Sequence, residues 1–246
     1  MEAPLRVVVS ILTYNRPGEL RALLDDLERE ARRVAGDVAV RIYDDCSERY
    51  GSIAGLAAQR GYTYVRASHN HGKAEHWRWV GRELADLRDV PADWYVFLPD
   101  DCRLVSGFFP RALALWERLD EPTALTLVAQ AERLGPCWTG MRPRHGDGWC
   151  EVGWIDGLHL CRRELLELLE FSVGEPPGRS AARRDGLRGS GVGQQLSTRA
   201  LRRGARLYRV DESLVELVPV PSQMNPRARA RHPLLSIRLA AEVSHD

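Results

Sequence analysis

The first hundred residues alternate between apolar strand-length runs and amphipathic helical stretches, and this alternation constrains the fold more than any other feature. Between residues 20 and 27, four leucines repeat at the spacing of one helix face. Strands separated by helices favour a largely parallel sheet, and right-handed crossovers then place helices on both of its faces. We therefore expect an α/β fold with a mostly parallel central sheet. The expected strands are residues 5–12, 38–43, 62–66 and 94–98, and the expected helices begin near residues 17, 52 and 70.

Polar clusters follow three of these four strands. The first strand runs into residues 13–16, the second ends at Asp44 and Asp45, and the fourth ends at Asp100 and Asp101. Adjacent carboxylates repel unless a cation lies between them, and open α/β sheets bind ligands beyond the carboxyl ends of their strands. The clusters therefore indicate a metal or substrate site, although each by itself is also compatible with an ordinary turn or helix cap.

The composition is typical of a soluble globular protein. The 246 residues are 44% hydrophobic and 28% charged, and no apolar run approaches the length that crosses a bilayer. Five cysteines without a CxxC spacing argue against a disulfide framework or a zinc site. We expect a cytoplasmic protein without a signal peptide or membrane span; the oligomeric state is left open.

The second half is less regular. The sequence predicts one domain over residues 1–220, in two halves (1–105 and 106–220), followed by a basic tail (221–246). The elements expected in the second half are a strand at 123–128, a loop or lid at 134–148, a strand at 151–160 interrupted at Asp156 and Gly157, a helix at 162–170, a mobile loop at 174–188, a helix from 192 and a strand at 207–210.

Charge is unevenly distributed. Residues 177–232 contain twelve arginines and four acidic residues, a net charge of +8 that leaves −7 on the rest of the chain. Such a segment suits a phosphate-bearing partner. The chain has a single lysine, Lys73, so the arginine excess also fits a compositional bias with solvated side chains.

Four segments resemble family 2 glycosyltransferases with the GT-A fold, a single-domain Rossmann-like architecture. They occur in the family's order over roughly the first 110 residues. Each is weak alone, and together they are specific. The segments are Val-Ser-Ile-Leu-Thr-Tyr-Asn-Arg-Pro at 9–17, Ile-Tyr-Asp-Asp-Cys-Ser at 42–47, Asn-His-Gly-Lys at 70–73 and Phe-Leu-Pro-Asp-Asp at 97–101.

The resemblance implies a nucleotide-sugar donor, most simply a UDP-sugar such as UDP-glucose. Residues 1–105 would form the nucleotide-sugar-binding half and residues 106–220 the acceptor half. One of the two carboxylates at 44 and 45 would accept a hydrogen bond from a uracil N–H or a ribose hydroxyl. The residues that would line the donor pocket are Thr13, Asn15, Arg16, Asp44, Asp45, Asn70, Gly72 and Lys73.

The resemblance also implies Mn²⁺ or Mg²⁺ at the end of the fourth strand. A divalent ion there would stabilise the departing nucleoside diphosphate. The family's usual first metal aspartate falls at Pro99, which has no side-chain ligand. Asp101 is therefore the expected direct ligand, and Asp100 the expected contact to ribose or to a metal-bound water. Weak metal binding, or turnover without metal, stays open.

The catalytic base is less plainly marked. Many family members carry it in a Glu-Asp pair at the start of a late helix, where this chain has Val192 and Gly193. Asp156 is the best substitute for an inverting transfer, which needs a carboxylate to take the acceptor's proton. Asp156 followed by Gly157 also fits a simple turn.

The acceptor is suggested by a looser likeness to a bacteriophage branch of these enzymes, associated with glycosylating hydroxymethylated pyrimidines in DNA. In that interpretation the enzyme works in the host cytoplasm. A glycan, lipid or protein acceptor, an inactive sugar-nucleotide-binding protein and a nucleotidyltransferase remain alternatives. The expected phosphate contacts on DNA are Arg179, Arg183, Arg184, Arg227 and Arg229.

Overall fold

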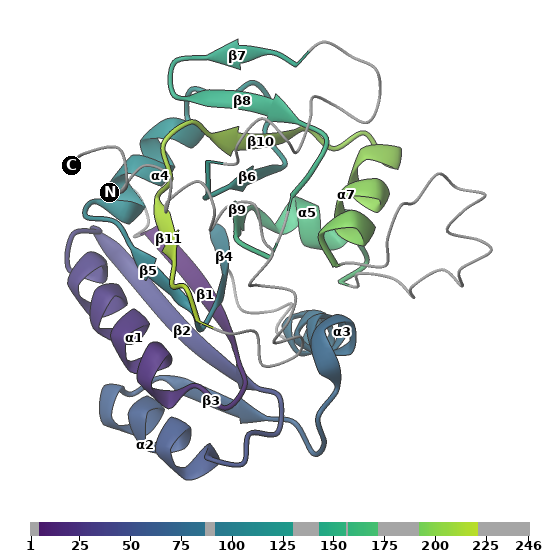
Figure 1. Ribbon diagram of the computed structural model, residues 1–246. Helices are drawn as coiled ribbons and strands as arrows, with labels where there is room; N and C mark the ends of the chain where they lie inside the picture. The colour runs from purple at the N-terminus through teal and green to yellow at the C-terminus, as the bar shows by residue number, and fades with distance from the viewer. Residues whose placement is uncertain (1–4, 87–91, 130–142, 156, 172–191, 221–246) are drawn as a thin grey trace, which may run out of the picture.

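The computed structural model describes residues 5–86, 92–129, 143–155, 157–171 and 192–220 (Figure 1). The strands and helices alternate in the first half as the sequence predicts. In that half the elements are β1 (Leu5–Thr13), α1 (Pro17–Ala31), β2 (Gly36–Asp44), α2 (Tyr50–Arg60), β3 (Thr63–Arg66), α3 (Gly72–Asp86) and β4 (Trp94–Pro99). They are followed by β5 (Cys102–Leu104), α4 (Phe108–Trp116), β6 (Ala124–Thr126), β7 (His145–Gly146), β8 (Trp149–Val152), β9 (His159–Cys161), α5 (Arg163–Leu168), α7 (Val192–Arg202), β10 (Leu207–Val210) and β11 (Val215–Leu217).

A nine-stranded sheet runs through the molecule in the order β3-β2-β1-β4-β9-β6-β10-β8-β7. The strands β3, β2, β1 and β4 are parallel, which confirms the expected arrangement of the first half. Strand β9 pairs antiparallel with both β4 and β6, so the second half of the sheet is mixed. One continuous sheet thus joins the two expected halves of the chain.

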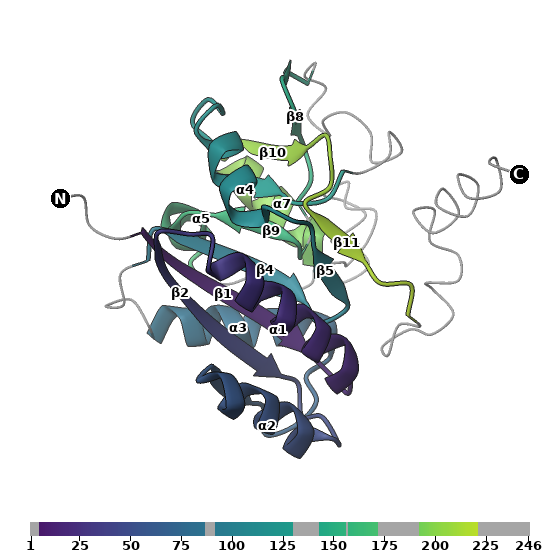
Figure 2. The same cartoon turned by 90° about the vertical axis from the view of Figure 1, so that its left-hand side faces the viewer.

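Two apolar layers cover the sheet. Along β1 the side chains alternate between the faces, as a pleated strand requires. Val7, Val9 and Ile11 pack into the layer that contains α1, α2 and α4. Val8 and Leu12 pack into the opposite layer, against α3, α5 and α7. Figure 2 shows this arrangement from the side, with α1 in front of the sheet and α3 behind it.

Three features of the second half differ from the sequence prediction. Residues 151–160 are not one interrupted strand, since β8 pairs with β10 whereas β9 inserts between β4 and β6. Part of the expected loop at 134–148 forms β7, which pairs with β8. Helix α4 and the two-stranded sheet of β5 and β11 were not predicted. The short strands have too few residues for a period to be read, and long-range pairing creates them.

Two buried acids on α1 fasten the start of the second half to the first. Asp26 accepts hydrogen bonds from the Arg103 guanidinium and from the Leu104 backbone N–H. Glu30 accepts one from the backbone N–H of Phe108, the first residue of α4. These contacts fix β5, which directly follows the carboxylate pair Asp100 and Asp101.

In the part of the chain described, no helix is both long and apolar enough to span a bilayer.

Candidate active site

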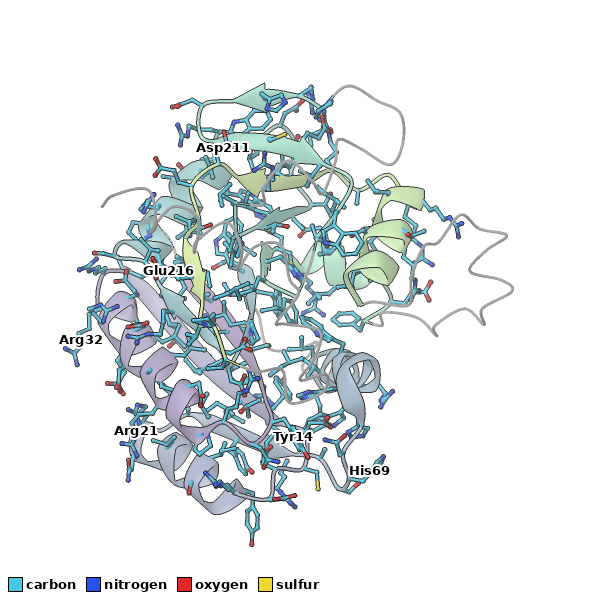
Figure 3. The ribbon with its side chains drawn as sticks, in the orientation of Figure 1. Tyr14, Arg21, Arg32, His69, Asp211 and Glu216 are labelled. Atoms are coloured by element: carbon cyan, nitrogen blue, oxygen red, sulfur yellow. The ribbon has the colours of Figure 1, made fainter. Side chains whose placement is uncertain are left out.

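The carboxyl ends of three neighbouring strands form the candidate site. Thr13, the last residue of β1, lies opposite Asp44 of β2, and Leu12 lies opposite Pro99 of β4. The loops that leave these three strands therefore begin at one level along the same edge of the sheet. Figure 3 shows Tyr14 and His69 towards one end of the molecule and Asp211 at the opposite end.

A buried arginine lies between the two carboxylates that follow β4. Nη1 of Arg16 is 3.5 Å from Oδ1 of Asp100 and in closer contact with Oδ2 of Asp101. All three residues are 6% exposed or less. Because buried charges are costly unless they are paired, the guanidinium stabilises two carboxylates that would otherwise repel each other. The cation beside this pair in the structure is thus a side chain of the protein, whereas the metal or substrate group expected from the sequence stays a prediction.

Asp100 also ties the end of β4 to the loop after β1. Its Oδ2 accepts hydrogen bonds from the Thr13 hydroxyl at 2.9 Å and from the Tyr14 backbone N–H at 3.1 Å. Burial, and then the adjacent charge of Asp101, raise the pKa of Asp100 to about 7. The cationic and hydrogen-bonding partners act against this rise but do not cancel it.

The loops after β1 and β2 are joined through Asn15 and Ser47. The Asn15 N–H donates to the Ser47 hydroxyl at 2.7 Å, and the Asn15 side-chain oxygen accepts from the Glu48 N–H at 2.8 Å. Asn15 has φ 55°, a left-handed conformation that asparagine tolerates better than most residues. Asn15 therefore shapes this loop. Ser47 belongs to the motif at residues 42–47, but was not predicted from the sequence as a site residue.

The Asp44 carboxylate is fully buried and held from three sides. Oδ1 accepts from the backbone N–H of Ser47 at 3.0 Å and from its hydroxyl. Oδ2 accepts from the Tyr64 hydroxyl at 2.6 Å, and Nε of Arg66 lies 3.9 Å away. Tyr64 lies on β3. No motif around it in the sequence indicates a site residue.

The Asp45 carboxylate holds the loop that enters α3. It accepts hydrogen bonds from the backbone N–H groups of His71 and Gly72 at 2.7 and 3.0 Å, and from Nδ1 of His71 at 3.0 Å. The Asn70 side chain donates to the Asp45 carbonyl at 3.1 Å. The structure thus brings together Asp45, Asn70 and Gly72. Lys73 follows in the first turn of α3, and its side chain lies outside the described residues.

An aromatic stack backs this loop. The ring of His71 lies parallel to Trp79, with 5.6 Å between the ring centroids, and His76 stacks on the same indole at 5.7 Å. Burial lowers the pKa of His76 to about 4, so its imidazole is neutral and Nε2–H donates to the Tyr43 carbonyl at 3.1 Å. Trp77 is buried in the core, whereas Trp79 packs against histidines beside the candidate site.

Asp156, the expected base, lies outside the described residues. Its neighbours are described on both sides. The Ser197 hydroxyl accepts from the Ile155 N–H at 2.8 Å and lies 2.5 Å from the Gly193 carbonyl. A Cβ on Gly157 would meet the Trp77 ring at 2.9 Å. Ile155 thus packs against α7, and Gly157 packs against Trp77 of α3.

The start of α7 has no room for the carboxylate that the family usually places there. A Cβ on Gly193 would lie 2.7 Å from the Ile155 carbonyl oxygen and 2.8 Å from the Trp154 ring. Such distances are shorter than normal van der Waals contact, so any side chain at this position requires the segment 154–155 to move. The sequence difference at residue 193 thus has a steric counterpart in the fold.

The donor set at the end of β4 fits a divalent ion that is shared with a diphosphate. Asp101 supplies carboxylate oxygen, which Mg²⁺ and Mn²⁺ prefer, and Asp100 is its neighbour. Within the described ranges no group of three or more His, Cys, Asp or Glu side chains is suited to hold a metal. An ion at Asp101 would therefore need phosphate oxygens and water to complete its coordination.

The fold is that of GT-A glycosyltransferases. S. aureus TarS 1-349, solved in complex with UDP-GlcNAc, superposes with a TM-score of 0.62 at 14% identity over 93% of this chain and 61% of that one. The mannosyltransferase PcManGT from Pyrobaculum calidifontis, in complex with GDP-Man and Mn²⁺, gives 0.56 at 18% identity over 96% and 66%. GalNAc-T7 with UDP, GalNAc and Mn²⁺ gives 0.58 at 14% identity over 89% and 44%.

This chain spans about three-fifths of the length of the TarS fragment. No known protein family matches its sequence, and no curated protein matches it either. At these identities the likeness establishes the fold, and the chemistry has to be argued from the site residues of this chain.

Proposed function

We propose that the chain is a metal-dependent inverting glycosyltransferase that uses a nucleoside-diphosphate sugar, with UDP-sugar as the donor. The observation that carries the proposal is the convergence of Arg16, the Asp44–Asp45 pair and the Asp100–Asp101 pair at one sheet edge of a GT-A fold. Similar folds have been solved with UDP-GlcNAc and with GDP-Man and Mn²⁺. In such folds ligands occupy this edge of the sheet.

The donor pocket is assigned by chemistry. The Arg16 guanidinium, together with Lys73, would bind the diphosphate, because both side chains are cationic hydrogen-bond donors that bind phosphate oxygens. Thr13, Asn15 and the Asp44–Asp45 pair would shape the nucleoside end. Asn70 and Gly72 form the backbone rim that the donor approaches.

Asp101 would be the direct ligand of the divalent ion, and Asp100 the contact to ribose or to a metal-bound water. When bound, the ion would neutralise the charge of the departing nucleoside diphosphate. Asp156 would accept the proton of the acceptor hydroxyl while its oxygen attacks the anomeric carbon in line. The new bond joins that oxygen to the sugar, and the bond to the diphosphate breaks with the electron pair leaving on the phosphate oxygen.

For the acceptor we propose a hydroxymethylated pyrimidine in phage DNA. The support is the net charge of +8 over residues 177–232. The five arginines expected to contact phosphate lie outside the described residues. A base hydroxyl in duplex DNA would have to be exposed or flipped to reach a carboxylate.

Calorimetric titration with UDP and with other nucleoside diphosphates, each with and without Mn²⁺, tests the donor half. We expect UDP binding that Mn²⁺ strengthens, and we expect Asp101→Asn to remove that strengthening, about tenfold or more for a charge-assisted ligand. Asp211→Asn is the matched control, because it removes an equivalent carboxylate from an exposed position at the far end of the molecule.

Two results would contradict the proposal. If no nucleoside diphosphate binds under any condition, the chain shares only the fold with these enzymes. If turnover of a nucleotide substrate releases pyrophosphate rather than a nucleoside diphosphate, the chain is a nucleotidyltransferase. Nucleotide binding that persists in Asp156→Asn without turnover is the expected result for a base.

A further inference from the structure

Arg16 and a divalent ion would compete for the same oxygen atom. The guanidinium contacts Oδ2 of Asp101, and Asp101 is the expected metal ligand. The side chains of both residues are at most 7% exposed, so water screens the interaction weakly. A guanidinium and a divalent cation on one carboxylate oxygen repel each other, and the contact that is seen therefore opposes metal binding.

The backbone of Arg16 is held independently of its guanidinium. Arg16 precedes Pro17, the first residue of α1, and its carbonyl accepts the Leu20 N–H at 3.0 Å. The helix thus anchors its backbone. The side chain, in contrast, contacts carboxylates at a different strand end, so a change of rotamer would move the guanidinium from Asp101 without moving the helix.

A diphosphate offers the guanidinium a better partner than the crowded carboxylate pair. Arginine binds phosphate oxygens with two parallel hydrogen bonds, which fixes its direction as well as its charge. Diphosphate oxygens would also supply the ligands that the end of β4 lacks for holding a metal. One incoming group can therefore remove the competing cation and complete the metal's coordination.

We propose that Arg16 is a gate for the metal site: without donor its guanidinium occupies Asp101, and the donor diphosphate draws it away so that Asp101 becomes available to a divalent ion. This inference rests on the proposed function for its second half. It makes Arg16 responsible for part of the coupling between nucleotide and metal binding, and such coupling is reciprocal.

Arg16→Gln tests the gate through binding rather than activity. We expect Arg16→Gln to bind Mn²⁺ alone at least about fivefold more tightly than wild type and to bind UDP alone at least about fivefold more weakly, each a coupling of ordinary size. Mn²⁺ is followed by electron paramagnetic resonance and UDP by calorimetry. The gain in Mn²⁺ affinity should vanish in Arg16→Gln/Asp101→Asn.

Arg206→Gln is the matched control. Arg206 also pairs with carboxylates, those of Asp120 and Glu151, but immediately precedes β10, which lies three strands from β4 in the sheet. It should leave both affinities within twofold of wild type, about the error of such measurements. Should Arg16→Gln fail to fold by circular dichroism, Arg16→Lys replaces the planar guanidinium with a single ammonium group and should raise Mn²⁺ affinity at least about threefold, outside that error.

Tighter Mn²⁺ binding together with weaker UDP binding distinguishes a gate from a structural role, whose loss would weaken both. If the Arg16 variants bind Mn²⁺ no more tightly than wild type, or if both ligands weaken together, the gate is refuted. If wild type binds no nucleotide while Arg16→Gln still gains Mn²⁺ affinity, the proposed function fails, and the competition between Arg16 and metal at Asp101 stands.

Discussion

At the scale of single residues, the hydrogen-bond partners of each carboxylate distinguish the members of the two acidic pairs. Asp44 and Asp45 are adjacent in sequence, yet Asp44 binds the Ser47 turn and Tyr64, while Asp45 binds the loop at 71–72. Asp100 binds the loop after β1, and Asp101 contacts Arg16. Four carboxylates that look equivalent in the sequence thus connect four different parts of the site.

Gly193 gives a prediction at this scale. Gly193→Ala should cost about 1 to 3 kcal/mol of unfolding free energy, because its Cβ would overlap the Ile155 carbonyl. Gly55→Ala is the matched control: it lies inside α2 with no atom within 4 Å of the added Cβ, and should gain about 0.5 to 1 kcal/mol. Urea denaturation of both variants measures the difference. Equal stability of Gly193→Ala and wild type would show that α7 can carry a side chain there.

At the scale of elements, α1 holds the strand that follows the carboxylate pair. Asp26 is 1% exposed and contacts β5 through Arg103 and Leu104. Burial by itself would raise its pKa, but hydrogen bonds from Arg103, Arg29 and the Leu104 N–H outweigh burial and lower the pKa below 3.8. A folded-state pKa below the unfolded value stabilises the fold above the unfolded pKa.

Asp26→Asn should therefore lower the unfolding free energy by about 2 kcal/mol at pH 7, since it removes the charge of a buried carboxylate that accepts hydrogen bonds from two half-exposed arginines and a backbone N–H. The difference from wild type should shrink as pH falls below 3.8 and through the folded pKa of Asp26, where the wild-type carboxylate is protonated as well. Denaturation curves at pH 7 and pH 3 measure both values.

Asp25→Asn provides the comparison on the same helix. Asp25 is 56% exposed and pairs with Arg60, so its loss should cost less than about 1 kcal/mol. If Asp26→Asn is no more costly than Asp25→Asn, the buried contacts to β5 do not stabilise the fold as argued.

At the scale of the whole molecule, the separation of charge suggests how an acceptor is bound. The basic stretch at 177–232 is balanced by a net negative remainder of the chain. If the acceptor is DNA, arginines release counterions from phosphates, and affinity depends steeply on salt. A neutral glycan acceptor gives no such dependence.

Binding of hydroxymethylated DNA should weaken by about two to three orders of magnitude between about 50 and 200 mM salt, for roughly five phosphate contacts. Replacing Arg179, Arg183 and Arg184 by glutamine should reduce the slope of log K against log salt by roughly 3. Arg60→Gln is the control, because Arg60 is committed to Asp25 and Glu28. Acceptor use that does not vary with salt would refute a DNA acceptor.

The sequence by itself determined the first half of the fold and the sheet edge where the candidate residues gather. Helix and strand periods are local properties, and polar residues at strand ends can be read without knowing how the strands pair. The expected elements from β1 to β4 are confirmed to within a few residues at their ends.

Only the tertiary structure decided which partners those residues have. The pairing of Arg16 with Asp101 joins residues 85 positions apart, and Tyr64 reaches Asp44 across neighbouring strands. The insertion of β9 between β4 and β6 and the crowding at Gly193 also depend on segments distant in sequence. Such contacts follow from packing of the whole chain, which no local period encodes.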